Sequence, residues 1–338
     1  MKRTRVADSF WRGAKVAVTG AGGFIGSHLT EELARRGAHV RAMVRYNSAS
    51  RWGFLDRTPD QLMKRIEVRA GDLADPFFVR EFVAGQDVVF HLGALIAIPY
   101  SYEAPAQYVQ TNVQGTLNIL EACLRAKTSK VVHTSTSEVF GTAQYVPIDE
   151  THPRQGQSPY SATKIGADAL AESFHRSFGL PVAIARPFNT YGPRQSARAV
   201  LPTIATQLLA GVKQLEIGSL DPVRDFNYVD DTVQGFLAVA RSPKSVGEDI
   251  NLGSGRGVTI GAVVKLLMKI TGRKVPVKTD GRRVRPQKSE VLRLICDNRK
   301  AAKLLGWKPR WTLEKGLDQT ASYVLAHLAD YKAGRYNV

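Results

Sequence analysis

The chain has 338 residues, enough for one large domain or two smaller domains with a substantial core. It carries 47 Lys and Arg against 30 Asp and Glu, and these basic residues are spread along the chain without a zinc-finger or RNA-recognition motif. We therefore expect no nucleic-acid partner. The excess positive charge is explained equally well by an acidic small-molecule substrate or by a basic solvated surface. No apolar run approaches a membrane span, and Cys123 and Cys296 are too few for a disulfide framework, so we expect no membrane partner and two reduced, structural cysteines.

The first half of the chain alternates short β-branched runs with helical patterns, which is typical of βαβ units on a parallel sheet. Its basic N-terminal segment lacks the apolar stretch of a signal peptide, which favours a cytoplasmic location. Strands are predicted at Lys15–Thr19, His39–Val44, Ile66–Val68, Asp87–Leu92, Lys130–Thr134 and Pro181–Ala185. Helices are predicted at about 24–36, 76–84, 105–127 and 158–178.

A glycine-rich turn joins the first strand to the first helix, with Gly20, Gly23 and Gly26 in the run TGAGGFIG (19–26). A turn between a strand and a helix exposes backbone N–H groups and the positive end of the helix dipole, and both suit a pyrophosphate. We therefore predict a dinucleotide site that includes Phe24 and Ile25 at the start of the helix. After the third strand, Asp72 and Leu73 are candidates for a contact with adenine, although Asp72 also suits a turn or a helix cap.

The end of the second strand bears on the choice of cofactor. NAD sites usually carry an acidic residue there to hold the ribose hydroxyls, but this chain has Val44 followed by Arg45. Arg45 would suit a 2′-phosphate, or it is an exposed surface arginine. We expect NAD(P), with NADP slightly favoured.

Two further segments carry the chemistry. Thr136, Ser137 and Glu138 follow the strand at 130–134, and the run YSATK (160–164) begins a helix that Ser158 can cap, with Pro159 at its first position. Tyr160 and Lys164 are four residues apart and share one helix face. A lysine ammonium beside a phenol lowers its pKa and makes tyrosine a base near neutral pH. This combination predicts proton and hydride chemistry on an alcohol.

The regular alternation fades after Arg186, where glycines and prolines divide the chain into shorter elements. We predict an α/β fold, a Rossmann-type doubly wound parallel sheet with a smaller mixed C-terminal lobe. Residues 1–186 would form the NAD(P)-binding domain with the catalytic residues, and 187–338 mainly the substrate-binding lobe, with the chain re-crossing between them.

Several polar and aromatic residues are assigned structural roles. His91 and His133 lie at strand ends without a second ligand at zinc-like spacing, so we expect hydrogen-bonded histidines and no metal site. Asp230 and Asp231 suit a helix start, while Trp52 and Trp307 are most simply packing residues.

The ordered motifs TGAGGFIG, YSATK, RPFNTYGPRQ (186–195) and RDFNYVDD (224–231) resemble the extended short-chain dehydrogenase/reductase family, in particular its NAD(P)-dependent nucleotide-sugar epimerases and dehydratases. The runs YNSASRWGFLD (46–56), TSTSEVFGTAQYVPIDE (134–150) and RPQKSEVLRLICDN (285–298) are most similar to 4,6-dehydratases of legionaminic-acid-type pathways. The resemblance implies a nucleotide-diphosphate sugar as substrate, a tightly bound and recycled cofactor, and a homodimer through helices near 105–125 and 158–178.

The resemblance also implies roles for the central residues. Tyr160 would take the proton of the sugar 4-hydroxyl while hydride passes to the nicotinamide, Thr136 would bond the same oxygen, and Lys164 would hold the ribose. Glu138 would take the C5 proton and help expel the C6 hydroxyl. The product would be a 4-keto-6-deoxy sugar, with an NDP-N-acetylhexosamine as the expected substrate.

Ser137 keeps other reactions of the family open. Glucose-type dehydratases carry Asp-Glu after the threonine, whereas the Thr-Ser-Glu of this chain also resembles GDP-mannose-type dehydratases and UDP-glucuronate decarboxylases. A 4-epimerase needs no C5 base, so Glu138 argues against it. A non-catalytic nucleotide sensor is disfavoured by the intact Thr136, Tyr160 and Lys164.

Substrate contacts are expected in the second half of the chain. Asn189 and Arg224 resemble residues that meet the substrate diphosphate, and Arg285 could join them, with Ser137 on the sugar side. Structural alternatives are a turn cap for Asn189, a surface ion pair for Arg224, and a solvated basic loop for Arg285.

Overall fold

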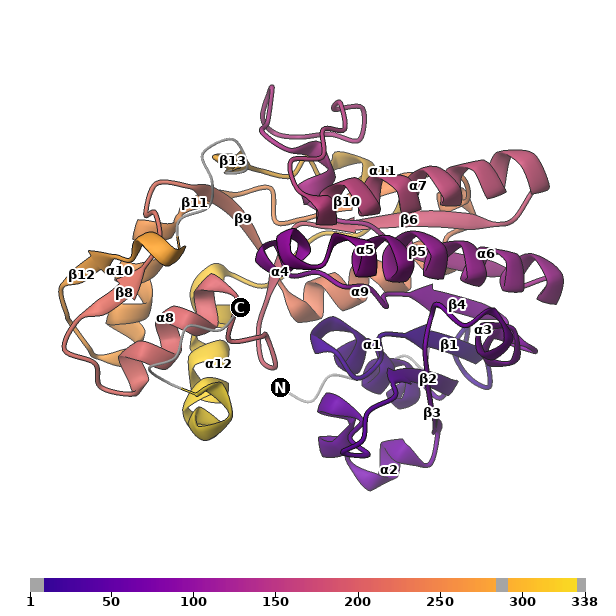
Figure 1. The fold of residues 1–338 in the computed structure, drawn as a ribbon, viewed down its shortest axis with the longest axis horizontal. Helices are drawn as coiled ribbons and strands as arrows, with labels where there is room; N and C mark the ends of the chain where they lie inside the picture. Colours follow the sequence, from indigo (N-terminus) through magenta and orange to yellow (C-terminus); the bar gives the residue numbers. More distant parts are fainter. Residues whose placement is uncertain (1–8, 284–290, 333–338) are drawn as a thin grey trace.

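A seven-stranded parallel sheet forms the larger part of the molecule in the computed structural model, which describes residues 9–283 and 291–332 (Figure 1). The strand order is β10-β6-β5-β4-β1-β2-β3, and every neighbouring pair is parallel. The strands are β1 (Lys15–Thr19), β2 (His39–Arg45), β3 (Ile66–Gly71), β4 (Val88–His91), β5 (Lys130–Thr134), β6 (Val182–Pro187) and β10 (Asp249–Leu252).

Helices cover both faces of this sheet because its central strands are apolar on both sides. In β1, Val16 and Val18 belong to one hydrophobic cluster and Ala17 to another, and all three are buried. The first face packs against α1 (Phe24–Arg35) and α9 (Val229–Arg241), and the second against α3 (Pro76–Val83), α6 (Gly115–Ala126) and α7 (Pro159–Phe178). The predicted doubly wound α/β class is confirmed.

Most predicted elements of the first half are present, and the largest differences concern β3 and the helix predicted at 105–127. β1 and β5 have the predicted bounds, whereas β3 runs three residues further, to Gly71. The helix predicted at 105–127 is divided into α5 (Pro105–Tyr108), a π-helical turn η2 (Val109–Gln114) and α6. Hydrophobic periodicity does not distinguish these helix types, because all three keep apolar residues on neighbouring turns.

Short elements complete the first half. They are η1 (Gly53–Arg57), α2 (Asp60–Met63), α4 (Ile98–Glu103) and the 3₁₀ turn η3 (Ser137–Phe140).

The second half is more regular than its glycines and prolines suggested. Four of its helices have ten residues or more, so the expectation of only shorter elements is wrong. The punctuating residues mark helix ends: Pro202 lies in the first turn of α8, Pro243 follows α9, and Gly272 ends α10 in the left-handed conformation.

A smaller mixed lobe stands beside the sheet (Figure 1, left). Its central strand β9 (Val223–Tyr228) pairs with β7 (Asn189–Tyr191), β11 (Gly257–Thr259) and β13 (Arg293–Leu294), and β8 (Leu215–Ile217) pairs with β12 (Val277–Thr279). Its helices are α8 (Val200–Leu209), α10 (Ile260–Thr271), α12 (Leu313–Ala326) and η7 (Leu328–Tyr331). Between lobe segments, the chain returns to the main sheet to form α9, η4 (Pro243–Ser245) and β10, and α11 (Arg299–Leu305) packs near β10.

Across the described residues, no helix has both the length and the apolar character that crossing a membrane requires.

Candidate active site

A cavity of about 760 Å³ opens at the carboxyl ends of the parallel strands. Its walls come from the glycine turn after β1, the end of β2, the segments after β4 and β5, the start of α7, and the chain from Pro187 to Ala199. Ligands of open parallel sheets bind at this edge, where the strand order reverses. The cavity brings together most of the predicted site residues: Gly20, Gly23, Phe24, Ile25, Gly26, Arg45, Thr136, Ser137, Glu138, Tyr160, Lys164 and Asn189.

The glycine turn is shaped for a dinucleotide. Gly20 has a φ of +67°, and a Cβ on Gly26 would lie 2.1 Å from the carbonyl oxygen of Gly20, so neither position accepts a side chain without backbone movement. Gly23 caps α1 without a side-chain hydrogen bond, and the first turn holds no acidic residue. The free N–H groups and the positive end of the helix dipole therefore face the cavity, which fits the pyrophosphate of NAD(P).

The segment after β2 forms the adjacent wall. Trp52 lies against Gly22, where a Cβ would meet the Trp52 carbonyl oxygen at 2.4 Å, and its side chain is 41% exposed and lines the cavity. The expectation that Trp52 is a packing residue is therefore wrong. The amide of Asn47 donates to the carbonyl oxygens of Arg45 and Arg51, at 3.2 and 2.8 Å. These two hydrogen bonds hold Arg45 and Arg51 together beside Val44 on the cavity wall.

Asp72 and Leu73 do not line the cavity. The exposed Asp72 accepts a hydrogen bond from the Ala74 N–H at 2.9 Å, which is the turn role considered above. The cap of α3 is instead Asp75, which accepts from the backbone of Phe77. Leu73 is buried in the cluster between the sheet and α6.

The catalytic candidates converge from β5 and α7. Ser158 and Ser161 form a reciprocal capping box with Pro159 in the first turn, as the sequence predicted for Ser158, and this fixes where α7 begins. Tyr160 and Lys164 follow on the cavity side, both almost fully buried. Opposite them, the Thr136 hydroxyl accepts from the Glu138 N–H at 3.2 Å and so holds Glu138 in the first turn of η3.

The electrostatics of the tyrosine differ from the sequence expectation. Burial raises the pKa of Tyr160 well above its usual range, a hydrogen bond with Thr136 lowers it, and the charge of Glu138 raises it further. The Lys164 Nζ donates to the Thr134 carbonyl oxygen at 2.7 Å, and the hydrogen bond to the phenol comes from Thr136. Burial lowers the pKa of Lys164 itself to about 8. The predicted lowering of the tyrosine pKa is therefore wrong for this arrangement, in which desolvation of the phenolate dominates.

Three substrate candidates differ in where they lie. Asn189 lines the cavity, and its amide lies 3.5 Å from the Asp225 carbonyl oxygen. Arg224 is buried, does not line the cavity, and donates to the Val223 carbonyl oxygen at 3.1 Å. Arg285 lies outside the described residues.

The cavity also contains a cation that the sequence reasoning missed. Arg198 lines it, and its Nε lies 3.3 Å from the Ser196 hydroxyl. Its positive charge lowers the pKa of Tyr108, whose ring packs edge-on against Tyr160 at 6.3 Å. Arg198 therefore lies at the Tyr160 end of the cavity, where the expected sugar would bind. The only sequence signal was a basic residue three positions after the RPFNTYGPRQ motif.

The histidines near the site are structural, as expected. His91 shares hydrogen bonds with Thr19 and Thr116, at 2.9 and 3.1 Å, and His133 contacts the buried carboxylate of Asp168 at 3.2 Å. Burial lowers the pKa of His133 to about 4 and keeps it neutral.

Three further structural assignments are confirmed. Asp230 and Asp231 lie in the first turn of α9, and the buried Trp307 indole donates to the Asp231 carbonyl oxygen. Cys123 and Cys296 are buried free thiols.

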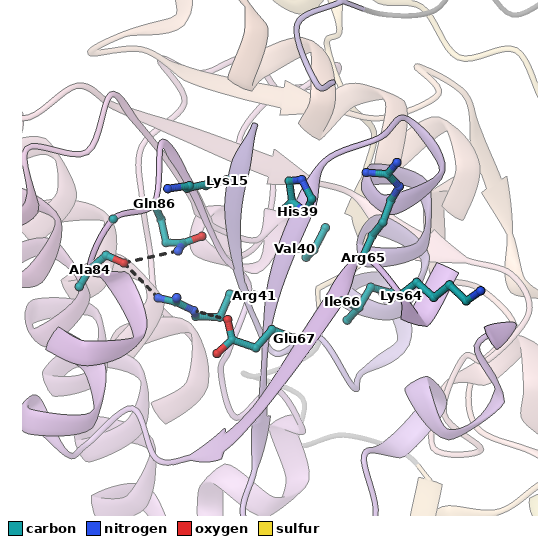
Figure 2. A pocket seen from close by; sticks show the side chains of 11 residues that line it. Lys15, His39, Val40, Arg41, Lys64, Arg65, Ile66, Glu67, Ala84 and Gln86 are labelled. Atoms are coloured by element: carbon teal, nitrogen blue, oxygen red, sulfur yellow. Dashed lines mark hydrogen bonds and ion pairs between the residues drawn. The ribbon is translucent and has the colours of Figure 1, made fainter. Parts of the chain in front are cut away.

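A second cavity, of about 420 Å³, lies at the opposite end of β1 to β3 (Figure 2). It contains none of the predicted site residues, and the Arg41 guanidinium on its wall is engaged by Glu67 and by the Ala84 carbonyl oxygen. Its basic side chains are Lys15, His39, Arg41, Lys64 and Arg65. Since it holds none of the converging polar groups described above, the cavity at the carboxyl ends is the candidate active site.

Comparisons with known proteins agree with this assignment. The family model described as GDP-mannose 4,6 dehydratase matches residues 17–320. A dTDP-glucose 4,6-dehydratase from Streptomyces antibioticus is 34% identical over 310 residues, which cover 90% of this chain and 91% of that protein.

Solved structures of two activities share the fold. A dTDP-glucose 4,6-dehydratase from Streptomyces venezuelae with NAD bound gives a TM-score of 0.81 at 28% identity and covers 94% of this chain and 99% of its own. A UDP-glucuronic acid 4-epimerase from Bacillus cereus, in complex with UDP-glucuronic acid and NAD, gives a TM-score of 0.83 at 30% identity. The match covers 93% of this chain and 99% of the epimerase chain. NAD is thus present in both of these structures, and the names of both proteins specify a nucleotide sugar.

Proposed function

The chain belongs to the GDP-mannose 4,6-dehydratase family, and on this premise we propose that it is an NAD(P)-dependent nucleotide-sugar 4,6-dehydratase. Its substrate would be an NDP-hexose, in particular an NDP-N-acetylhexosamine, and its product the 4-keto-6-deoxy sugar nucleotide. The observation that carries the proposal is the position of Glu138 in the same cavity wall as Thr136 and Tyr160. A carboxylate there supplies the second proton transfer that elimination needs.

The first half-reaction is oxidation at C4. A bound nicotinamide supplies the hydride acceptor, and later the donor, that an alcohol–ketone interchange requires. Tyr160 takes the proton of the 4-hydroxyl, and Thr136, which already bonds the phenol, holds the same oxygen. The fixed positive charge of Lys164 favours the phenolate during this transfer.

The second half-reaction is loss of water. The new ketone acidifies C5, so Glu138 can take the C5 proton and return it to the C6 hydroxyl, which departs as water. C6 would then take back the hydride from the reduced nicotinamide while C5 takes up a proton from solvent, which gives the 4-keto-6-deoxy sugar. The charge of Glu138 already raises the pKa of Tyr160, which supports its being close enough to act on the same sugar. Ser137 and Asn189 line the same cavity, and we propose that Ser137 bonds the sugar and Asn189 meets the diphosphate.

A second candidate reaction is decarboxylation of UDP-glucuronate. It shares the oxidation at C4 and needs a cation for the C6 carboxylate, and Arg198 at the sugar end of the cavity favours it. A 4-epimerase, such as the Bacillus cereus relative, would leave Glu138 without a task in the chemistry.

The proposal is tested by incubating purified protein in deuterium oxide with UDP-glucuronate and with the UDP-, GDP-, CDP- and dTDP-derivatives of hexoses and N-acetylhexosamines. A product lighter by one water, with deuterium at C5, is expected from one N-acetylhexosamine nucleotide. Carbon dioxide from UDP-glucuronate would establish the decarboxylase instead, and a C4-inverted sugar of unchanged mass the epimerase.

For the cofactor, we propose NADP in preference to NAD. Arg45 and Arg51 stand together on the wall beside Val44, where a carboxylate would otherwise hold the ribose. Two guanidinium groups can flank a 2′-phosphate but offer less to a bare diol.

We also propose a homodimer through α5, η2, α6 and α7. Val109 is 54% exposed on η2, and Phe178 at the end of α7 is also exposed, which supports an apolar contact between copies. Sedimentation of the purified protein at micromolar concentration should give twice the mass of the chain.

A further inference from the structure

A buried carboxylate stands behind the two reactive residues of α7. Asp168 follows Lys164 by four residues and Tyr160 by eight, so the three occupy one side of the helix. Its side chain is completely buried, whereas aspartate is almost never fully buried without partners. No step of the proposed reaction uses it.

Each oxygen of Asp168 has a partner. Oδ2 accepts from the Ser135 hydroxyl at 2.6 Å and from Arg186 Nη2 at 3.2 Å, while Oδ1 faces His133 Nε2 at 3.2 Å. Burial opposes ionisation, but the hydrogen bond from His133 and the charges of Arg186 and Lys164 together lower the pKa of Asp168 well below its usual range. Asp168 is therefore an anion at neutral pH.

Arg186 is itself held from its far side. Its guanidinium is fully buried, and Nη1 donates to Asp249 of β10 at 3.0 Å and to Asn251 at 3.3 Å. Phe140 lies under the same group, with 4.9 Å from the guanidinium carbon to the ring centre. The interior thus holds a row of alternating charge that runs from Lys164 through Asp168 and Arg186 to Asp249.

The other ionisable groups near this row do not replace Asp168. They are Tyr160 on α7, Glu138 on η3, His133 on β5, His91 on β4, and Arg154 and Lys300 beside Asp249. His91 and His133 are neutral, since burial and the Lys164 charge lower the pKa of each, and Tyr160 is a neutral phenol. Burial lowers the pKa of Lys164 to about 8, and Asp168 is the charge that raises it against this effect.

We propose that Asp168 is a positioning residue that keeps Lys164 protonated inside the active site, and that Arg186 holds Asp168 in place for this task. The inference rests on the proposed function, since a charged Lys164 matters for the acidity of Tyr160 in the oxidation step. An ammonium that lost its proton at neutral pH would no longer favour the phenolate.

The direct test is a pH titration of Lys164 by NMR in protein labelled at the lysine ε-carbons, with Lys164→Arg to assign the resonance. Asp168→Asn keeps the shape of the side chain and removes its charge, and we expect it to move the Lys164 midpoint to lower pH by about one unit. The matched control is Asp249→Asn, which removes a carboxylate from the other side of Arg186 and should leave the midpoint unchanged. An unchanged midpoint in Asp168→Asn overturns the proposal, and this result does not depend on any substrate.

Should Asp168→Asn fail to fold because Arg186 is left buried without an anion, the double variant with Arg186→Met removes both charges. Since Asp168 and not Arg186 is the charge that acts on Lys164, the double variant should also lower the midpoint. With active enzyme, the alkaline limb of kcat should move by the same amount as the NMR midpoint. If kcat falls equally at every pH and the alkaline limb of its pH profile does not move, Asp168 has only a structural role. If the wild-type protein catalyses no dehydration, the proposed function is rejected, but the NMR result still stands.

Discussion

Arg194 donates a hydrogen bond from Nη2 to Oε1 of Glu31 at 2.8 Å, although 163 residues separate them in the chain. Glu31 lies on α1, the helix that begins at the glycine turn, and Arg194 directly precedes Gln195, which lines the cavity. The Glu31 carboxylate also accepts from the Thr58 hydroxyl at 3.0 Å, just after η1. One carboxylate thus joins the cofactor side of the site to the substrate side.

Glu31→Gln should therefore weaken substrate binding from outside the cavity. The change keeps the side-chain shape but removes the ion pair, which corresponds to about 1 kcal/mol and roughly a fivefold rise in KM, with kcat little changed. Steady-state kinetics measure this, and Glu32→Gln, which breaks the pairing of Arg35 and Arg36 on the same helix, is the control. If the two changes raise KM equally, the weaker binding comes from a general disturbance of α1 and not from the broken pair of Glu31 and Arg194.

Glu138→Gln should separate the two half-reactions. Oxidation at C4 should persist, visible as absorbance of the reduced cofactor, while release of water falls by about 10² to 10⁴ because the C5 base is lost. Tyr160→Phe is the matched variant and should abolish both signals. Dehydration by Glu138→Gln near the wild-type rate would show that another group removes the C5 proton.

Arg45→Ala should discriminate between cofactors. If the guanidinium meets a 2′-phosphate, NADP affinity should fall by about 1.5 to 3 kcal/mol, the range for hydrogen bonds to charged groups, while NAD affinity stays constant. Calorimetric titration with each dinucleotide measures both affinities. The same loss for NAD and NADP would defeat the phosphate assignment.

Gly26→Ala should damage both folding and cofactor binding. The added methyl would lie 2.1 Å from the Gly20 carbonyl oxygen, so the turn must move, at a cost of about 1 to 3 kcal/mol in the free energy of unfolding. Gly166→Ala is the control, because a Cβ on this α7 glycine meets only Val113 Cγ2, at 3.6 Å, and alanine favours the helix by up to about 1 kcal/mol. Urea unfolding should move in opposite directions for the two variants.

Stability should fall as the pH drops from about 6.5 towards 4. Burial and the charge of Arg194 lower the pKa of His28 to about 4, so in this window the unfolded chain takes up a proton that the folded chain excludes. The free energy of unfolding then decreases by up to about 1.4 kcal/mol for each pH unit from this group. His28→Gln retains a donor for the Pro193 carbonyl oxygen and should flatten the slope in urea unfolding at a series of pH values. Identical slopes would assign the acid sensitivity to other groups, His133 first among them.

The sequence was sufficient for the parallel sheet, the glycine turn and the meeting of Tyr160, Lys164, Thr136 and Glu138, because these follow from local patterns at strand and helix ends. It did not reveal Arg198 or Trp52 on the cavity wall, since their positions depend on how the chain folds back after β7 and β2. It also misjudged the pKa of Tyr160, because neither burial nor the attachment of Lys164 to the Thr134 carbonyl oxygen can be read from residue spacing.

The place of β10 at the sheet edge has a consequence for protein synthesis. β6 leaves the ribosome well before β10, yet the two are neighbours in the finished sheet, and Asp249 on β10 neutralises Arg186 on β6. A nascent chain that ends between them exposes an unpaired strand edge and a guanidinium that lacks one of its carboxylates. The NAD(P)-binding domain predicted at 1–186 therefore cannot complete its folding before β10 has been synthesised. A fragment that ends at residue 186 would be prone to aggregation and would depend on chaperones.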